Sequence, residues 1–253
     1  MILAAYGLLT AAVLMAMGWI ISVARHDAGV ADVLWGPVIT ATGISYLMGL
    51  PTASWRGWIA VTLVAIWALR LAIHVVYRNH GKPEDRRYRE IRARNEPGFW
   101  WRSAYLIFGL QAVLAWIVAM PLLGVVQSAS PLHLLDLVGG LLWVTGFTFE
   151  AVADYQLLRF QSRAGAERGV MDKGLWRYSR HPNYFGECCL WWGMWLVALG
   201  AGAWWTVIGP LLLTFLLLRV SGVALTEKDI ADRRPDYQQY VLRTSAFFPR
   251  VPR

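Results

Sequence analysis

The chain has 253 residues, of which 57% are hydrophobic and only 16% are charged, and its mean hydropathy is +0.42. Because a soluble domain carries roughly a quarter charged residues, this chain has too few to cover a globular surface. The formal net charge of +8 would suggest nucleic-acid binding in a soluble protein, but here we attribute it to membrane topology and expect no nucleic-acid partner.

Seven apolar stretches follow one another along the chain. They cover roughly 2–24, 30–50, 57–77, 103–125, 134–158, 185–200 and 204–222. Each is long enough, or nearly so, to cross about 30 Å of hydrocarbon as a helix, although the sixth is short. The fold class that we expect is therefore all-α, a single polytopic membrane domain over 1–253 with seven transmembrane helices.

The positive charges are distributed asymmetrically between the two sides of these spans. With the N-terminus outside, 22 of the 24 Lys and Arg residues fall on the inner side, with Arg56 outside and Arg70 within the third span. The positive-inside rule then predicts an outside N-terminus and a cytoplasmic C-terminus. Many of these arginines can simply contact anionic membrane lipids.

Ionisable residues inside apolar stretches are costly and are therefore candidates for function. Glu150 and Asp154 lie four residues apart, on one helical face, near the inner end of the fifth span and close to Arg159. That face can meet a polar ligand from the cytoplasm, or it can be hydrated among the lipid headgroups. Asp32 and Arg70 can form a structural pair between helices, or they can line a polar pocket.

The most informative stretch, residues 174–187, reads GLWRYSRHPNYFGE. Its proline, Pro182, predicts the start of a helix. The polar side chains that gather there are Arg177, Arg180, His181 and Asn183. A helix N-terminus flanked by arginines suits a phosphate or carboxylate, so we expect these side chains to share one cavity. The sequence has no GxGxxG motif or Walker loop, so membrane helices and cytoplasmic loops have to hold any nucleotide.

This stretch resembles the C-terminal signature of the steroid 5-alpha-reductase superfamily. Across nearly the whole chain, five segments resemble its bacterial branch, which is usually labelled a domain of unknown function: 32–36 (DVLWG), 67–70 (WALR), 83–88 (PEDRRY), 180–184 (RHPNY) and 244–249 (TSAFFP). The resemblance implies a multi-pass protein of the cytoplasmic or inner membrane of a bacterium. It also implies an NADPH-dependent reductase that transfers a hydride to a C=C bond of a lipid-like, steroid- or isoprenoid-like substrate.

The resemblance implies substrate-side helices over 1–125 and a cofactor-binding module over 134–253. In the steroid reductases an acid matching Asp154 contacts the adenosine half of the cofactor, and residues matching Asn183 and Glu187 hold the nicotinamide half. The cofactor-binding residues that we expect are Asp154, Arg159, Arg177, Tyr178, Arg180, His181, Asn183, Glu187, Glu227, Tyr237 and Arg243.

The substrate side departs from the steroid reductases. Those enzymes bind a 3-keto group through a Glu of the second span and a Tyr of the third, whose equivalents here are Asp32 and Trp67. Because Trp cannot protonate a carbonyl oxygen, the departure argues against a 3-oxo-steroid. The expected substrate-binding residues are Trp35, Trp67 and Arg70, and the catalytic candidates are Asp32, Tyr184 and Glu187.

Two other classes of function stay open. Isoprenylcysteine carboxyl methyltransferases share an Arg-His-Pro-x-Tyr-x-Gly block and bind S-adenosylmethionine, which is the alternative cofactor. A non-enzymatic lipid-binding or transport protein is the third class, although the sequence has no repeated halves. The five histidines lack the spacing of metal ligands, and we expect no metal site.

Overall fold

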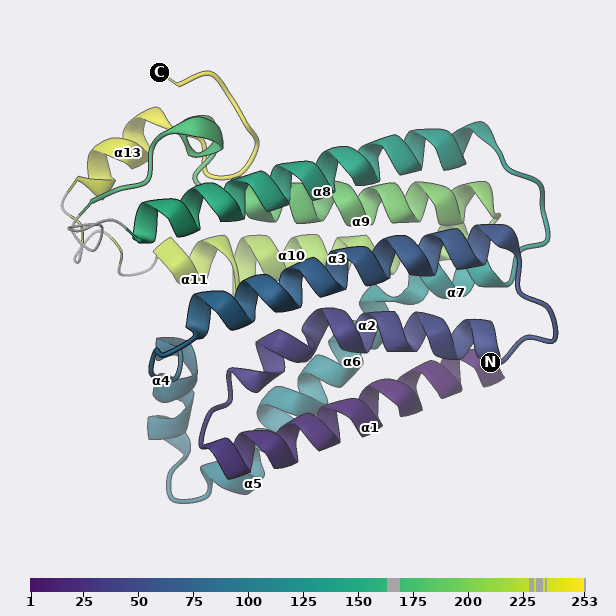
Figure 1. Ribbon diagram of the computed structural model, residues 1–253, viewed down its shortest axis with the longest axis horizontal. Coiled ribbons are helices and arrows are strands. Elements are labelled where there is room, and N and C mark those ends of the chain that lie inside the picture. Colours follow the sequence, from purple (N-terminus) through teal and green to yellow (C-terminus); the bar gives the residue numbers. More distant parts are fainter. Residues whose placement is uncertain (163–168, 228–229, 231–233, 235, 253) are drawn as a thin grey trace. The chain divides into compact units, whose positions relative to one another are not determined.

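The computed structural model describes residues 1–162, 169–227, 230, 234 and 236–252, and all regular secondary structure in these ranges is helical (Figure 1). Six helical segments in them are long and apolar enough to cross a membrane: Ile2–Arg25, Val30–Met48, Trp55–Asn79, Phe99–Val118, Leu134–Gln161 and Trp204–Glu227. The described chain thus has the all-helical, multi-pass character that the sequence predicts.

The predicted sixth span is present as helix α9 (Pro182–Gly200), which starts at the proline that predicts a helix start. It is not among the six apolar segments, because its 19 residues include Asn183, Glu187 and four aromatic side chains of low hydropathy, Tyr184, Trp191, Trp192 and Trp195. Six of the seven predicted spans therefore have the required length and hydropathy, and the span predicted over 185–200 stays a prediction.

The chain divides into two compact units. The first comprises Met1–Leu132 and Ala201–Ile208, and the second comprises His133–Gly200 and Gly209–Arg253. The assignment of substrate and cofactor roles to the two parts of the chain stays a prediction.

The first unit contains helices α1 (Ile2–Arg25), α2 (Val30–Met48), α3 (Trp55–Asn79), α4 (Arg86–Asn95), α5 (Phe99–Ser103), the π-helical η1 (Ala104–Gly109), α6 (Leu110–Val118) and α7 (Met120–Val126). Helices α2 and α3 pack closely, since a Cβ added at Gly36 would lie 2.8 Å from the Cα of Ala68. The predicted span 103–125 differs from the structure. It is interrupted at Ala119, and α7 begins with Pro121 in its first turn, where a proline lacks the N–H that would continue the preceding helix.

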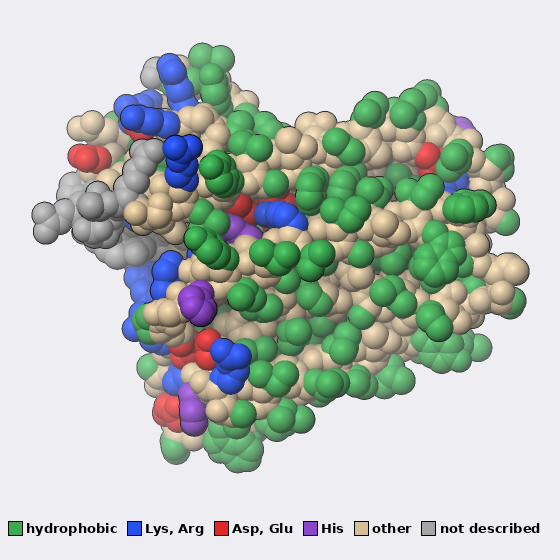
Figure 2. Space-filling model, in the orientation of Figure 1, with side chains coloured by type: hydrophobic (Ala, Val, Ile, Leu, Met, Phe, Trp, Pro, Cys, Tyr) green, Lys and Arg blue, Asp and Glu red, His purple; other side chains and the backbone are tan. Residues whose placement is uncertain are grey.

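Hydrophobic side chains spread over the long helices, whereas charged side chains gather around α4 (Figure 2). Helix α4 is short and has the sequence RRYREIRARN, so it has no apolar face that could cross a membrane. Asp85 caps its N-terminus by accepting a hydrogen bond from the Arg87 N–H at 2.9 Å. We therefore place α4 outside the membrane-spanning segments.

The second unit contains α8 (Leu134–Gln161), the 3-10 turn η2 (Gly174–Arg177), α9, α10 (Ile208–Phe215), the π-helical η4 (Leu216–Val220), α11 (Val223–Glu227) and α13 (Tyr237–Arg243). Helices α8 and α9 run antiparallel, with Gly139 against Gly193 and Gly146 against Gly186. A Cβ added at Gly146 would lie 2.5 Å from the Gly186 carbonyl oxygen, so these glycines let the two backbones approach each other. This close pairing positions the polar residues of the next section.

Candidate functional site

A buried polar cluster lies where the start of α9 meets α8. The Asn183 amide Nδ2 donates to the Asp154 carboxylate at 3.1 Å. One helical turn along, Gly186 packs against the backbone of Glu150, whose side chain is only 2% exposed. The neighbouring Glu187 is also buried. The predicted acids of α8 and the predicted residues of α9 therefore do come together.

This cluster is rich in hydrogen-bond acceptors. The Asn183 Oδ1 atom is buried and has no hydrogen-bond partner among the described residues. A buried amide oxygen without a donor is costly, so the position favours a ligand that brings an N–H or O–H group. A carboxamide or a ribose hydroxyl has such a group, and the residues present fit either one.

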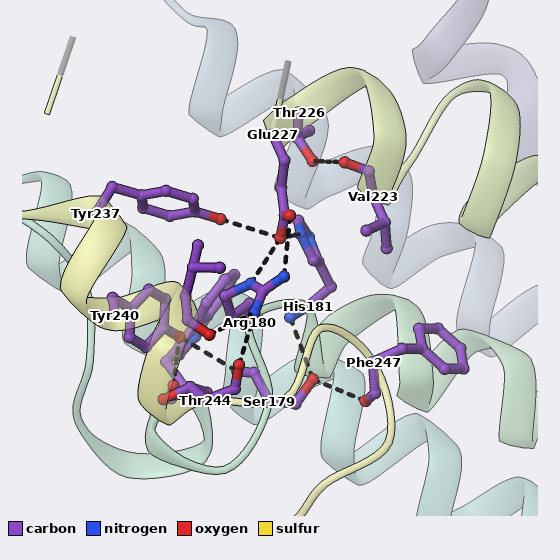
Figure 3. A network of polar contacts seen from close by, with 12 residues as sticks. Ser179, Arg180, His181, Val223, Thr226, Glu227, Tyr237, Tyr240, Thr244 and Phe247 are labelled. Atoms are coloured by element: carbon purple, nitrogen blue, oxygen red, sulfur yellow. Dashed lines mark hydrogen bonds and ion pairs between the residues drawn. The ribbon is translucent and has the colours of Figure 1, made fainter. Parts of the chain in front are cut away.

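A second polar network surrounds Arg180 and His181, the two residues that precede α9 (Figure 3). The Arg180 guanidinium donates to both carboxylate oxygens of Glu227, at 2.8 and 3.0 Å, and to the Thr244 carbonyl at 2.6 Å. His181 Nε2 lies 2.9 Å from the same carboxylate, and the Tyr237 hydroxyl donates to it at 3.1 Å. Glu227 thus collects three of the predicted cofactor residues around itself.

The charges of this network shift the ionisation of its members. Burial alone would lower the pKa of Arg180, but hydrogen bonding to the Glu227 carboxylate and its negative charge raise that pKa above its usual range. Burial and the same negative charge raise the pKa of Tyr237. Arg180 therefore stays charged and Tyr237 stays protonated at neutral pH.

The C-terminal segment 245–250 is held against residues 178–180. Three hydrogen bonds hold it: Arg180 N–H to Ser245 O (2.8 Å), Ser179 Oγ to Phe247 O (2.8 Å) and Arg250 N–H to Tyr178 O (2.9 Å). The buried Tyr240 of α13 adds a hydrogen bond from its hydroxyl to the Trp176 carbonyl. The start of α9 is therefore built jointly with the last described residues of the chain.

The residues expected to share one phosphate-binding cavity point in different directions. Arg177 is exposed, Arg180 turns to Glu227, and Asn183 turns to Asp154. Arg159 lines a cavity of about 230 Å³ together with Gln156 and Lys173. The expected grouping of these side chains around one cavity is thus found only in parts, and their cofactor roles stay predictions.

The remaining predicted residues of this unit lie at its edge or at the start of α9. Arg243 forms an exposed ion pair with Asp172 at 2.5 Å. Tyr178 is exposed, whereas Tyr184 stacks on the imidazole of His181, with the ring centroids 5.4 Å apart and the planes 4° from parallel. Tyr184 is therefore held in a fixed orientation.

In the first unit, Asp32 joins a polar cluster that the sequence reasoning missed. The Tyr88 hydroxyl donates to Asp32 Oδ1 at 2.6 Å, and Arg87 Nη2 donates to Oδ2 at 2.8 Å. Arg87 is held in turn by Asp85 at 3.0 Å. Helix α4 therefore supplies polar partners of Asp32 that the sequence reasoning did not name, and the pairing of Asp32 with Arg70 stays a prediction.

Glu84, which lies just before α4, binds the backbone at the start of α2. Its carboxylate accepts from the Ala28 N–H at 2.8 Å and from Arg92 at 2.8 and 3.0 Å. Burial alone would raise the pKa of Glu84, but the hydrogen bonds from Arg92 and Ala28 lower it. Arg92 also lies over the Phe99 ring, 4.2 Å from its centroid. The segment PEDRRY was singled out by resemblance, and its two acids followed by two arginines were the available signal of these contacts.

The predicted substrate residues on α2 and α3 differ in exposure. Trp67 is completely buried, while Trp35 and Arg70 are half-buried. Trp67 therefore belongs to the packing of the first unit, and the substrate roles of all three stay predictions. Residues 163–168 of the basic loop after α8 lie outside the described residues. Within the described ranges, no group of three or more His, Cys, Asp or Glu side chains could hold a metal ion.

Comparisons with known proteins find similarity over most of the chain. The family described as "Protein of unknown function (DUF1295)" matches residues 18–244. A protein of Schizosaccharomyces pombe, Uncharacterized protein C594.04c, is 26% identical over 284 residues, covering 97% of this chain and 79% of that protein. No solved structure matches the chain. The family match includes the polar clusters of both units.

Proposed function

The chain belongs to the DUF1295 family of proteins of unknown function, and on that premise we propose that it is a membrane-embedded, NADPH-dependent reductase of a C=C bond. The substrate that we propose is lipid-like, because helices long and apolar enough to cross a membrane place the chain where lipid-soluble molecules dissolve. The resemblance of residues 174–187 to the steroid 5-alpha-reductase superfamily supports this assignment.

The observation that carries the proposal is the buried Asn183 Oδ1 beside Asp154. These two side chains accept hydrogen bonds from the carboxamide and ribose groups of the cofactor. When bound, NADPH supplies the hydride. Glu150 and Glu187 extend the acceptor surface along the same two helices.

The role that we assign to Arg180 is positioning rather than phosphate binding. Its guanidinium is occupied by Glu227 and Thr244, so it fixes the start of α9. The phosphate contacts fall instead to the exposed Arg177 and Arg243 and to Arg159 in its cavity. Tyr184, stacked on His181, is oriented to donate a proton.

On the substrate side, the proposed polar contact is the Asp32–Tyr88 pair. Its hydroxyl and carboxylate lie 2.6 Å apart and are held by Arg87, so they offer both a donor and an acceptor to an oxygen of the substrate.

We also propose seven spans, with α9 as the sixth, and an outside N-terminus. The location would then be the cytoplasmic or inner membrane of a bacterium.

Calorimetry with the purified full chain tests this function. NADPH should bind the wild type, and Asn183→Ala should weaken binding about tenfold, as expected for the loss of one buried hydrogen-bonding group. Asn95→Ala is the matched control, because in the described part of the chain that amide donates only to the carbonyl of Ile91 within α4. Equal NADPH binding by wild type and Asn183→Ala would overturn the assignment.

One observation favours a second candidate, an S-adenosylmethionine-dependent methyltransferase. Three buried carboxylates, Glu150, Asp154 and Glu187, line the α8–α9 cluster and suit a cationic ligand as well as a hydroxylated one. S-adenosylmethionine carries a positive sulfonium and an ammonium group. A thermal shift with this compound and none with NADPH would replace the reductase by the methyltransferase.

A further inference from the structure

A polar hollow of about 260 Å³ lies between the end of α13 and the C-terminal segment. Three arginines line it, Arg180, Arg243 and Arg250. The hydrogen bonds from residues 178–180 to residues 245–250 fix one wall, so the hollow is built in the folded chain and does not depend on a loose tail.

The three arginines of the hollow differ in how their charge is balanced. Arg180, whose side chain is 9% exposed, is paired with Glu227, and Arg243 is paired with Asp172. The exposed guanidinium of Arg250 has no hydrogen-bond or ion-pair partner among the described residues, although its backbone N–H is fixed to Tyr178. Among the described residues, Arg250 is therefore the arginine of the hollow that lacks a counter-charge, and its backbone is held at Tyr178.

Large apolar side chains flank this charge. Leu242, Phe248 and Val251 are 80%, 61% and 82% exposed. Phe248 is held in place by the rings of Phe185 and Phe247, with centroids 6.1 and 5.3 Å away. Exposed apolar side chains beside arginines are the pattern of a surface that lies at the boundary between lipid headgroups and acyl chains.

We propose that this hollow is a binding site for the phosphate group of an anionic phospholipid, with Arg250 as the residue that recognises it. A dinucleotide phosphate has the same charge, but Leu242, Phe248 and Val251 would then face water without a partner. A phospholipid fills both requirements, because its phosphate is joined through glycerol to two acyl chains that can contact the apolar side chains. This inference does not rest on the reductase function.

Native mass spectrometry of the full chain in detergent tests the site. The probes are phosphatidylglycerol and phosphatidylcholine with identical acyl chains. We expect the wild type to retain phosphatidylglycerol more strongly, and Arg250→Gln to lower that affinity about fivefold, the usual effect of one arginine near anionic lipid. Binding of phosphatidylcholine, whose choline cation partly neutralises its phosphate, should fall less, and Arg250→Lys should keep most of the affinity.

Arg94→Gln is the matched control, since Arg94 is also exposed and has no side-chain partner among the described residues. It removes the same charge from α4 and should leave phosphatidylglycerol binding unchanged. Unchanged lipid binding by Arg250→Gln, or an equal loss in both variants, overturns the site. So does a result in which NADPH displaces the lipid and Arg250→Gln weakens NADPH to the same extent. If NADPH never binds while the lipid result holds, only the reductase proposal fails.

Discussion

The guanidinium of Arg180 meets the carboxylate of Glu227 at two points, Nε to Oε1 at 2.8 Å and Nη2 to Oε2 at 3.0 Å. This pair joins Arg180, two residues before Pro182, to the end of α11, and the same guanidinium also donates to the Thr244 carbonyl. One largely enclosed side chain therefore connects three separate segments of the second unit.

Breaking this pair should destabilise the protein. We expect Glu227→Gln to lower the free energy of unfolding by about 1.5–3 kcal/mol, because it removes the charged acceptor from a guanidinium that is only 9% exposed. Asp172→Asn, which breaks the exposed pair with Arg243, should cost less than about 1 kcal/mol. Denaturant unfolding in detergent measures both. Equal costs would show that burial of the Arg180 pair has no energetic weight.

Two glycines of α8 should respond oppositely to the same substitution. In Gly146→Ala the new methyl group meets the Gly186 carbonyl oxygen and the Leu190 N–H at 2.5 Å, so the helices must separate. We expect a loss of about 1–3 kcal/mol in the free energy of unfolding. Gly140→Ala meets nothing within 4 Å and should stabilise the helix by about 0.5–1 kcal/mol. A thermal unfolding series in which both variants behave alike would contradict the packing described for α8 and α9.

The hold on α4 should weaken in acid. The pKa values of Glu84 and Asp85 are lowered in the folded chain by hydrogen bonds from Arg92 and Arg87, which more than offset burial. Carboxylates with lowered pKa values stabilise the fold above their ordinary values, about 4.3 and 3.9, and that contribution is lost as the pH falls below them. The protection factors of the α4 amides, that is, their exchange rates relative to the unfolded chain at the same pH, should therefore fall below about pH 4. Glu84→Gln should flatten this pH dependence; the same pH profile in wild type and variant would refute the explanation.

Tyr88→Phe isolates the contact between α4 and α2. The ring stays buried while the hydroxyl that donates to Asp32 is lost, and we expect a cost of about 1.5–3 kcal/mol, as for a hydrogen bond to a charged group. Tyr105→Phe is the control, because Tyr105 is exposed and makes no side-chain hydrogen bond in the described structure. Under the proposed function, Tyr88→Phe also lowers turnover. A Tyr88→Phe protein as stable as the control would show that the Tyr88 hydroxyl contributes nothing to holding Asp32.

Most of the helices could be predicted from hydropathy, because about 20 consecutive apolar residues leave few soluble alternatives. The third span, predicted over 57–77, extends over Trp55–Asn79 in the structure. The interruption at Ala119 was not predicted, since a proline inside an apolar run does not change its hydropathy. Residue type alone could not show that α9 pairs with α8 through glycines.

Local spacing predicted part of the candidate site. Glu150 and Asp154 are one helical turn apart, as are Asn183 and Glu187, and the structure brings the two pairs together. The partners of Arg180 and Asp32 could not be predicted in this way, because Glu227 and Tyr88 lie 47 residues beyond Arg180 and 56 residues beyond Asp32. The sequence offers several possible carboxylate partners for each arginine, and only the folded structure shows which of them it contacts.

The hydrogen bonds between residues 178–180 and 245–250 impose an order on biosynthesis. Helix α9 leaves the ribosome before Ser245, Phe247 and Arg250 have been translated. These three residues bond to residues 178–180, just before the start of α9. Until then Ser179 and Arg180 lack the carbonyl acceptors that fix them. A fragment that stops short of Thr244 would therefore carry the residues of the α8–α9 cluster without the support that sets their geometry.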